Sequence, residues 1–319
     1  MSNLSQFLGG KIKKSQVITA TGTFSPSSTL IASGGWVDAF VVGGGSGGVS
    51  YNGGSVYFYG GGGGAVCTST IQLSTTQTIN VTIGAGGAAN TASSAINNGG
   101  FTSVHWTSAV TGTVATTGGT TLTASATNSI ASKSFILIDS EIMYVSAGGG
   151  TTSLTVTRGA LGSVAATHSA AVIYVIGAAS GGGQGINSGI DYLSGVSYSG
   201  KSFTTSDPSS SPTYNGAFGG GAGGQALPPT YINTTFSGNY LAYVGNSGGS
   251  HYYYPYTMLP GGPGPGISGF GAGGTGAAGT PPFSTMNTAI VSTTSDNSGA
   301  GGSYTVAGKS GIVILTWFE

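Results

Sequence analysis

Glycine runs constrain this chain more than any other feature, because residues without a Cβ cannot build an ordinary side-chain core. Glycine supplies 63 of the 319 residues, nearly three times the usual share of about 7%. Collagen is excluded, since it requires glycine at every third position with abundant proline, and this chain has 11 prolines. The runs recur at residues 43–48, 60–64, 84–87, 181–185, 219–224, 261–266 and 269–274.

Two structures are compatible with these runs. Glycine can form a left-handed extended helix with three residues per turn, and such segments can pack closely enough to hydrogen-bond through their backbones. The runs can instead be mobile loops, because ordering glycine costs more backbone entropy than ordering any other residue. Charged residues make up 4% of the chain and apolar segments flank the runs, which favours packed segments. A mean hydropathy of +0.21 with 10% aromatics also argues against disorder of the whole chain.

Strand signals alternate with the glycine runs. No helix is predicted, because no long stretch places apolar residues at the 3.6-residue period. The last apolar segment, 311–318, is apolar on both faces and is therefore expected to be a central strand. We predict an all-β fold, a glycine-rich β-sandwich with packed polyglycine II-like segments. Its strands are expected at residues 17–24, 36–42, 65–73, 78–83 and 311–318.

A compositional change marks residues 106–176, where glycine becomes scarce and Thr, Ala and β-branched residues dominate. This change predicts an inserted small β-module. The predicted organisation is an N-terminal attachment arm at 1–16, a discontinuous glycine-rich β domain at 17–105 and 177–319, and the insert at 106–176.

The clearest strand of the insert is predicted at residues 135–145. A glycine turn at 148–150 would lead to a hairpin partner at 154–157. Strand alternation would put the apolar residues on one face and the two acids on the other. The apolar set is Ile136, Ile138, Ile142 and Tyr144, and the acids are Asp139 and Glu141.

Charge and targeting signals exclude several function classes. Seven basic and seven acidic residues leave no net charge to attract nucleic acid or an anionic membrane. No segment approaches the roughly 18–20 consecutive apolar residues that span a bilayer, and the first residues lack the pattern of a signal peptide. We therefore expect synthesis in a cytoplasm, with no nucleic-acid partner and no membrane insertion. Cys67 is the single cysteine, so a disulfide within the chain is excluded.

Catalytic chemistry has little support in the sequence. Asp139 and Glu141 are the only acidic residues close together in the sequence. Such a pair could catalyse hydrolysis or bind calcium. The simpler interpretation is a solvent-facing pair with one carboxylate bonded to Arg158 across a hairpin. The histidines, at positions 105, 168 and 251, have no metal-ligand spacing. No enzyme activity, cofactor or metal is predicted.

Binding has better support, because tyrosines gather between glycine runs. Tyrosine offers a large contact area, few rotatable bonds and a hydroxyl, and its ring stacks on sugars. The same residues can instead cover the glycine core, which has no side chains of its own to exclude water. The candidate receptor-binding residues are Tyr252, Tyr253, Tyr254, Tyr256, His251 and Tyr51. The candidate attachment residues in the arm are Phe7, Lys11, Lys13 and Lys14.

Several segments together carry a resemblance to a known family. Those at 22–24, 36–45, 60–64, 79–87 and 308–314 resemble the glycine-rich domain of phage tail-fibre proteins. Residues 136–145 and 154–162 with His168 are similar to a small β-module that recurs in phage tail proteins. Residues 1–10 are similar to the leaders of such proteins.

The resemblance implies a non-enzymatic adhesin of a virion tail, built as a homo-oligomer and most plausibly a homotrimer. Its partners would be a host cell-surface polysaccharide or outer-membrane receptor and other tail or baseplate proteins. Three other classes remain open. They are a structural tail component without receptor contact, an ice-binding protein with a flat regular face, and an enzyme whose cleft gathers distant acids.

Overall fold

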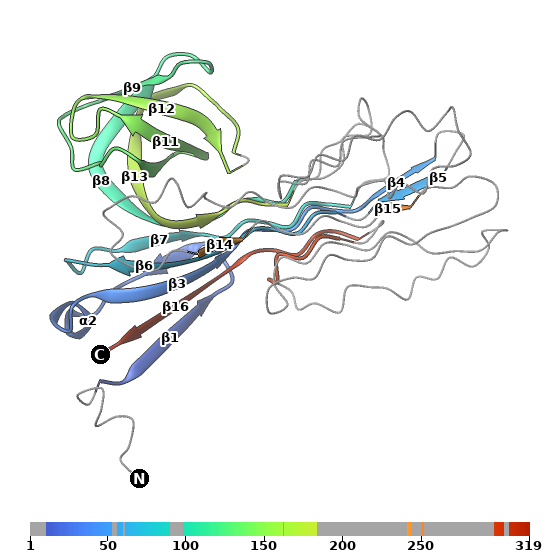
Figure 1. Ribbon diagram of the computed structural model, residues 1–319, viewed down its shortest axis with the longest axis horizontal. Helices are drawn as coiled ribbons and strands as arrows, with labels where there is room; N and C mark the ends of the chain where they lie inside the picture. Colours follow the sequence, from blue (N-terminus) through green and yellow to red (C-terminus); the bar gives the residue numbers. More distant parts are fainter. Residues whose placement is uncertain are drawn as a thin grey trace, which may run out of the picture.

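The computed structural model describes residues 11–52, 56–59, 61–89, 98–161, 163–183, 241–243, 250–251, 297–302 and 306–319. Its described part is almost entirely β (Figure 1). The elements are β1 (Lys13–Ile18), β2 (Gly22–Phe24), α2 (Ser28–Ala32), β3 (Trp36–Val42), β4 (Val49–Asn52), β5 (Val56–Tyr59), β6 (Val66–Gln72), β7 (Ile79–Thr82), β8 (Thr102–Val114), β9 (Thr121–Ala124), β10 (Ser134–Ile138), β11 (Glu141–Ala147), β12 (Ser153–Ala160), β13 (His168–Ser180), β14 (Leu241–Tyr243), β15 (Ser250–His251) and β16 (Ile312–Phe318).

Two antiparallel sheets form a sandwich. One sheet has the order β1-β16-β3-β6-β14, and the other contributes β2, β7 and the first part of β8 with the last part of β13. Side chains of both sheets meet in one core, which includes Val37, Val41, Ile71, Val104 and Val313. The predicted all-β class is confirmed. The predicted central position of the last strand is also confirmed, since β16 lies between β1 and β3.

The N-terminal part differs from the prediction in two ways. Residues 13–16, assigned to the attachment arm, belong to β1, an edge strand that exposes every residue except Ile18. An edge strand exposed on both faces needs no apolar alternation, so residues 13–16 carry no strand signal. The prediction that the chain contains no helix was also wrong, because residues 28–32 form the short helix α2. The Ser27 hydroxyl accepts a hydrogen bond from the Leu30 amide at 2.9 Å and caps α2, which buries Leu30.

The inserted region forms a closed six-stranded barrel. Its strands pair in the order β8-β9-β12-β11-β10-β13, and β13 pairs back with β8 to close the ring. Both β8 and β13 extend into the sandwich as well, so the barrel shares a continuous two-stranded ribbon with it (Figure 1). The barrel has its own core, which includes Leu122, Ile136, Met143, Leu154 and Ile173.

The single strand predicted at 135–145 is wrong, because the chain reverses at Asp139. This residue has φ +51°, a conformation that Asp adopts more readily than most residues. Two strands result, β10 and β11, with Ile138 opposite Glu141. The predicted common face is lost as well, since Ile138 lies in the barrel core whereas Ile142 lies in a separate cluster on the other face of the sheet. The predicted partner at 154–157 does pair with β11 as part of β12.

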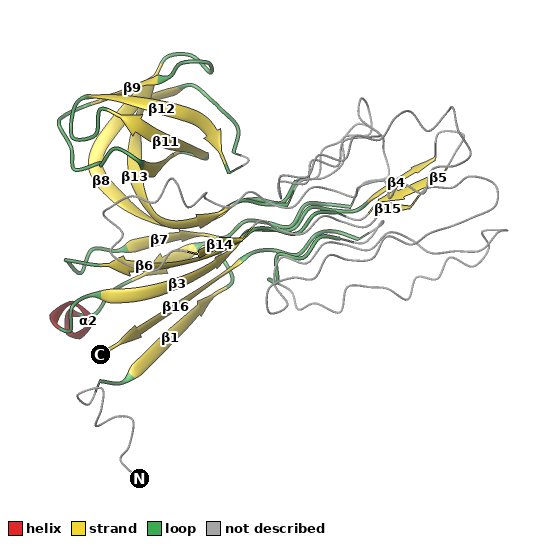
Figure 2. Cartoon of the chain, in the orientation of Figure 1, coloured by secondary structure: helices red, strands yellow, loops and turns green. Residues whose placement is uncertain are grey.

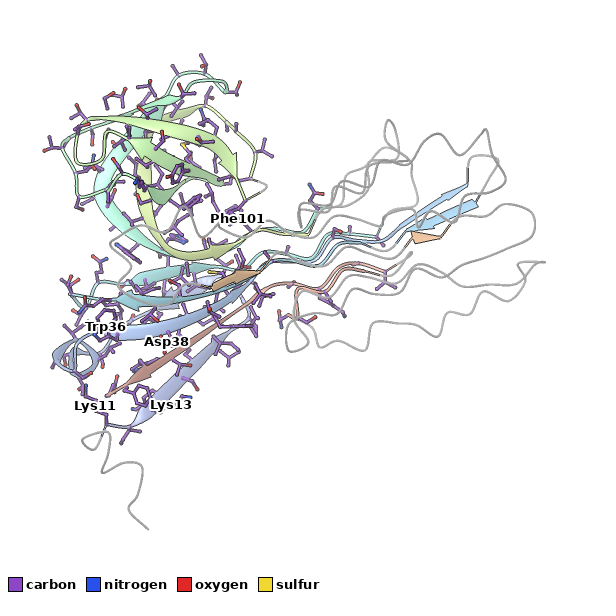
Figure 3. All side chains as sticks on the ribbon, in the orientation of Figure 1. Lys11, Lys13, Trp36, Asp38 and Phe101 are labelled. Carbon is purple, nitrogen blue, oxygen red and sulfur yellow. The ribbon has the colours of Figure 1, made fainter. Side chains whose placement is uncertain are left out.

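Glycine-rich segments extend the sandwich strands into a bundle of side-by-side chains (Figure 2). Residues 43–48 continue β3, and residues 83–89 and 181–183 continue β7 and β13. Residues 61–65, 98–100 and 306–311 lead into β6, β8 and β16, and residues 297–302 supply a seventh segment. Figure 3 shows that this bundle carries few side chains compared with the sandwich and the barrel.

The segment at 43–48 hydrogen-bonds to all six of the others. Gly44, Gly45 and Ser46 donate to Gly100, Lys309 and Gly62, and their carbonyls accept from Gly183, Gly87 and Gly302. Gly43 bonds to the same segment as Ser46, and Gly48 to the same segment as Gly45. The bonds thus repeat every three residues, the repeat of an extended three-residue-per-turn helix. The outer six segments also bond to one another in a closed ring.

Glycine is required in this bundle by the closeness of the backbones. A Cβ on Gly44 would lie closer than 3.0 Å to the backbone of Ala85, and one on Gly45 would meet Ala300 in the same way. Gly64 and Gly182 have equally close backbone neighbours. The Ala85 and Ala300 carbonyls accept hydrogen bonds from Gly100 and Lys309 in the ring, so they cannot move aside as a flexible side chain would.

Replacing Gly44 with alanine is expected to lower the free energy of unfolding by about 3 kcal/mol or more, because the new methyl overlaps backbone atoms. Gly118 is the matched control, since a Cβ there meets no atom within 4 Å. Gly118→Ala should leave stability unchanged or raise it by less than about 1 kcal/mol. Chemical denaturation of both variants measures the difference, and equal stabilities would contradict the tight bundle.

Candidate functional site

A three-stranded sheet lies at the end of the bundle farthest from β1 and from the C-terminus (Figure 1). Its strand order is β15-β5-β4. His251 pairs with Phe58, and Tyr51 pairs with Tyr57 on the other side of β5. The structure therefore brings two predicted site residues, far apart in the sequence, onto one small sheet. We call this sheet the distal tip.

The distal tip is rich in aromatic residues. Tyr51 belongs to β4, and Tyr57, Phe58 and Tyr59 belong to β5. The other predicted receptor-binding residues, Tyr252, Tyr253, Tyr254 and Tyr256, lie outside the described residues.

Three of the predicted attachment residues, Lys11, Lys13 and Lys14, lie at the opposite end. Phe7 is outside the described residues. The Lys11 ammonium donates to the Ser33 carbonyl at 2.9 Å, and Lys14 lies 3.5 Å from the Glu319 carboxylate. Lys13 is exposed at the start of β1 (Figure 3).

Two aromatic residues at this end were not singled out from the sequence. Trp36 and Phe318 lie on the solvent face of the sandwich, where they line a small pocket with Lys11 and Ser33. The sequence position of Trp36 could have identified it. In β3 the exposed positions of Trp36 and Asp38 alternate with the buried Val37 and Ala39, so strand alternation puts the Trp36 ring on the exposed face.

Glu141 is the centre of a buried charged cluster in the barrel. Arg158 donates to both of its oxygens at 2.7 Å, through Nε and Nη2. The amides of Gly159 and Ala166 donate at 2.9 and 3.0 Å, and His168 Nε2 lies 2.9 Å away. The predicted pair with Arg158 is confirmed. The predicted solvent position of Glu141 is wrong, because its side chain is fully buried.

The donors around Glu141 determine its ionisation. Burial alone would raise the pKa of this carboxyl, but the bonds from Arg158, Ala166, His168 and Gly159 outweigh burial and lower the pKa from 4.5 to about 2. The stabilisation that comes from this carboxylate is therefore complete above pH 4.5 and is lost as the pH falls through about 2.

The remaining groups of the cluster are also satisfied. Arg158 Nη1 donates to the carbonyls of Thr116 and Gly119 at 3.1 Å, and Nη2 also donates to the Ala166 carbonyl. His168 Nδ1 lies 2.8 Å from a carboxylate oxygen of Asp139, whose side chain is 62% exposed. Every nitrogen of the Arg158 guanidinium has an acceptor, so the geometry indicates a structural cross-link between β11, β12 and β13.

His105 is the other buried histidine of the described residues. It lies in β8 with Nδ1 3.1 Å from the Ser103 hydroxyl, and Tyr174 packs edge-on at 5.1 Å between ring centroids. Burial lowers the pKa of His105 to about 4, although a hydrogen bond from the ring to the Ser103 backbone acts in the opposite direction. The ring is thus neutral at pH 7 and part of the packed interior.

Within the described ranges, no group of three or more His, Cys, Asp or Glu side chains is arranged to hold a metal ion. Cys67 is buried in the sandwich core. Among the same residues, no helix has the length and hydropathy to cross a membrane. The sequence matches no known protein-family model and no curated protein.

Arg158→Met is expected to cost about 3–5 kcal/mol of folding stability, because it leaves the buried Glu141 carboxylate without its counter-ion. Lys13→Met removes one positive charge at an exposed site and serves as the control, with an expected change within about 0.5 kcal/mol. Thermal and urea unfolding of the two variants test the difference. A cost near that of the control would mean that the cluster is not a structural cross-link.

Stability should also depend on His105 in mildly acidic solution. Because its folded pKa of about 4 lies below the unfolded value of 6.5, the unfolded chain takes up the proton first. Stability is then full above pH 6.5 and falls by about 3 kcal/mol as the pH decreases towards 4. His105→Gln should flatten this dependence, measured by urea unfolding at half-unit pH steps. An unchanged slope in the variant would show that another group causes the loss.

Proposed function

We propose that this protein is a non-enzymatic tail-fibre or tail-tip protein of a phage virion that binds a host cell-surface receptor through its distal tip. The observation that carries the proposal is the glycine bundle. It extends the sandwich strands away from both described chain ends and presents the three-stranded sheet at the far end (Figure 1).

The composition of the tip supports a binding role. Three of the four residues of β5 are aromatic, and Tyr51 and His251 lie on the strands beside it. Tyrosine and phenylalanine supply large contact areas with few rotatable bonds, which suits recognition of a sugar or protein surface. Candidate receptors are a cell-surface polysaccharide and an outer-membrane protein.

The buried cluster around Glu141 supports the proposal that the protein is not an enzyme. Glu141, Arg158 and His168 are the candidates for acid–base chemistry, but they bond to one another and to backbone groups. A general base must reach the proton it removes. The Glu141 carboxylate accepts five hydrogen bonds within the barrel and has no exposed surface to offer a substrate.

A structural tail or baseplate component is the second candidate. The same rod would then join two virion proteins, one at each end, and the distal tip would be buried in the particle. The exposed apolar residues at the opposite end are compatible with this role. The resemblance of the glycine and strand segments to phage tail-fibre proteins supports both candidates equally.

Binding of the labelled full-length protein to a panel of intact Gram-negative and Gram-positive bacteria tests the receptor-binding role by flow cytometry. We expect a variant with Tyr252, Tyr253, Tyr254 and Tyr256 changed to alanine to bind at least tenfold more weakly, with an unchanged Tm. A loss of this size corresponds to about 1.4 kcal/mol or more, well within the contribution of four tyrosines.

The matched control changes four exposed threonines on the outer face of the barrel, which should leave cell binding unaltered. Equal losses in the two variants would count against a site at these four tyrosines. If the wild-type protein binds none of the bacteria, the structural tail component becomes the preferred function. The four control substitutions are Thr113→Ala, Thr121→Ala, Thr123→Ala and Thr155→Ala.

A further inference from the structure

Exposed apolar side chains are concentrated at the end of the molecule opposite the distal tip. Of the six exposed large hydrophobic residues in the described ranges, four lie around β1 and the start of β3. Trp36 and Phe318 line the pocket with Lys11 and Ser33. We define the basal surface as residues 11–17 with Ser33, Trp36 and Phe318. Its four apolar members are Ile12 (64% exposed), Val17 (58%), Trp36 (39%) and Phe318 (36%).

The basal surface includes a sheet edge with outward-facing backbone groups. β1 ends the five-stranded sheet and pairs only with β16 among the described strands. Ile12 and Glu319 exchange two backbone hydrogen bonds, of 2.6 and 3.0 Å. In an antiparallel pair such residues alternate with residues whose N–H and C=O point away from the partner. The N–H and C=O groups of Lys13, Ser15 and Val17 therefore point outward.

The edge is also positively charged. Lys11, Lys13 and Lys14 are three of the seven basic residues in the chain. Glu319 is the acidic residue beside them, and it pairs with Lys14 while also accepting from Ser27. Lysine on an edge strand discourages pairing with another cationic or neutral edge. It does not discourage an acidic strand, so the charge selects the kind of partner that the edge accepts.

We propose that the basal surface binds an extended acidic segment of a partner protein, which adds a strand to β1. The segment would hydrogen-bond to the backbone of Lys13, Ser15 and Val17 and place carboxylates beside the lysines. This inference goes beyond the proposed function, because it concerns the other end of the molecule and does not depend on what the tip binds.

A second copy of the chain is a less suitable occupant. Pairing two β1 strands edge to edge would bring the three lysines of one copy close to those of the other, with only one Glu319 in each to offset them. The resulting repulsion favours an acidic partner over self-association.

Ser15→Pro is the sharpest test of strand addition. Proline removes an outward N–H without removing a β1–β16 hydrogen bond, and proline is tolerated on edge strands. Ser15→Ala is the matched control because it keeps that N–H. The probe is a fluorescein-labelled peptide of alternating Asp and Val, compared with its Lys and Val counterpart by fluorescence polarisation on the full chain.

We expect the Asp peptide to bind wild type and Ser15→Ala equally, and at least tenfold more weakly to Ser15→Pro. The Lys peptide should bind at least tenfold more weakly to wild type. Lys13→Glu, at an exposed position of β1, should weaken binding of the Asp peptide at least threefold with an unchanged Tm. This variant keeps the proposal testable if Ser15→Pro fails to fold.

Three results would overturn the proposal. The first is equal binding, or no binding, of the acidic and basic peptides to the wild-type protein. The second is full binding of the acidic peptide to a folded Ser15→Pro variant. The third is self-association in sedimentation experiments that Ser15→Pro abolishes, which would show that a second copy covers β1.

Discussion

Backbone hydrogen bonds between closely packed glycine segments are the constraint on which the rest of this structure depends. The segment at 43–48 bonds to six neighbours, and a Cβ on Gly43, Gly44 or Gly45 would lie closer than 3.0 Å to the backbone of one of them. This packing requires seven segments that start in the correct register relative to one another. Glycine residues have no side chains that could set that register. The sandwich strands supply that alignment, because six of the segments continue a strand whose register is set by the apolar core.

The bundle also gives the molecule two different ends. One end carries β1, the terminal strand and the exposed residues Trp36 and Phe318. The other carries the aromatic three-stranded sheet (Figure 1). The barrel lies beside the sandwich on a shared ribbon, and its Glu141–Arg158 pair ties β11 to β12. A rod with chemically distinct ends suits a protein that is attached at one end and makes contact at the other, which is the function we propose.

Much of the strand pattern could be predicted from the sequence. The predicted strand at 36–42 has the bounds of β3, and those at 65–73, 78–83 and 311–318 differ from β6, β7 and β16 by one residue at each limit or less. The failures have local causes. β1 has no apolar alternation because both of its faces are exposed, and the turn at Asp139 contains no glycine to mark it. Of the candidate binding residues, His251 and Tyr51 lie on the strands either side of β5, whereas Trp36 and Phe318 at the other end were not singled out from the sequence.

The sequence by itself determined the all-β class, the strands β3, β6, β7 and β16, and the pair between Glu141 and Arg158, because alternation, β-branching and hairpin spacing act over short distances along the chain. Only the tertiary structure decided that Glu141 is buried, that β13 closes a barrel onto β8 and that one glycine segment is surrounded by six others. These features depend on contacts between residues far apart in the sequence. A glycine has no side-chain pattern that could specify its partner, so its neighbours are set by the strands that lead to it.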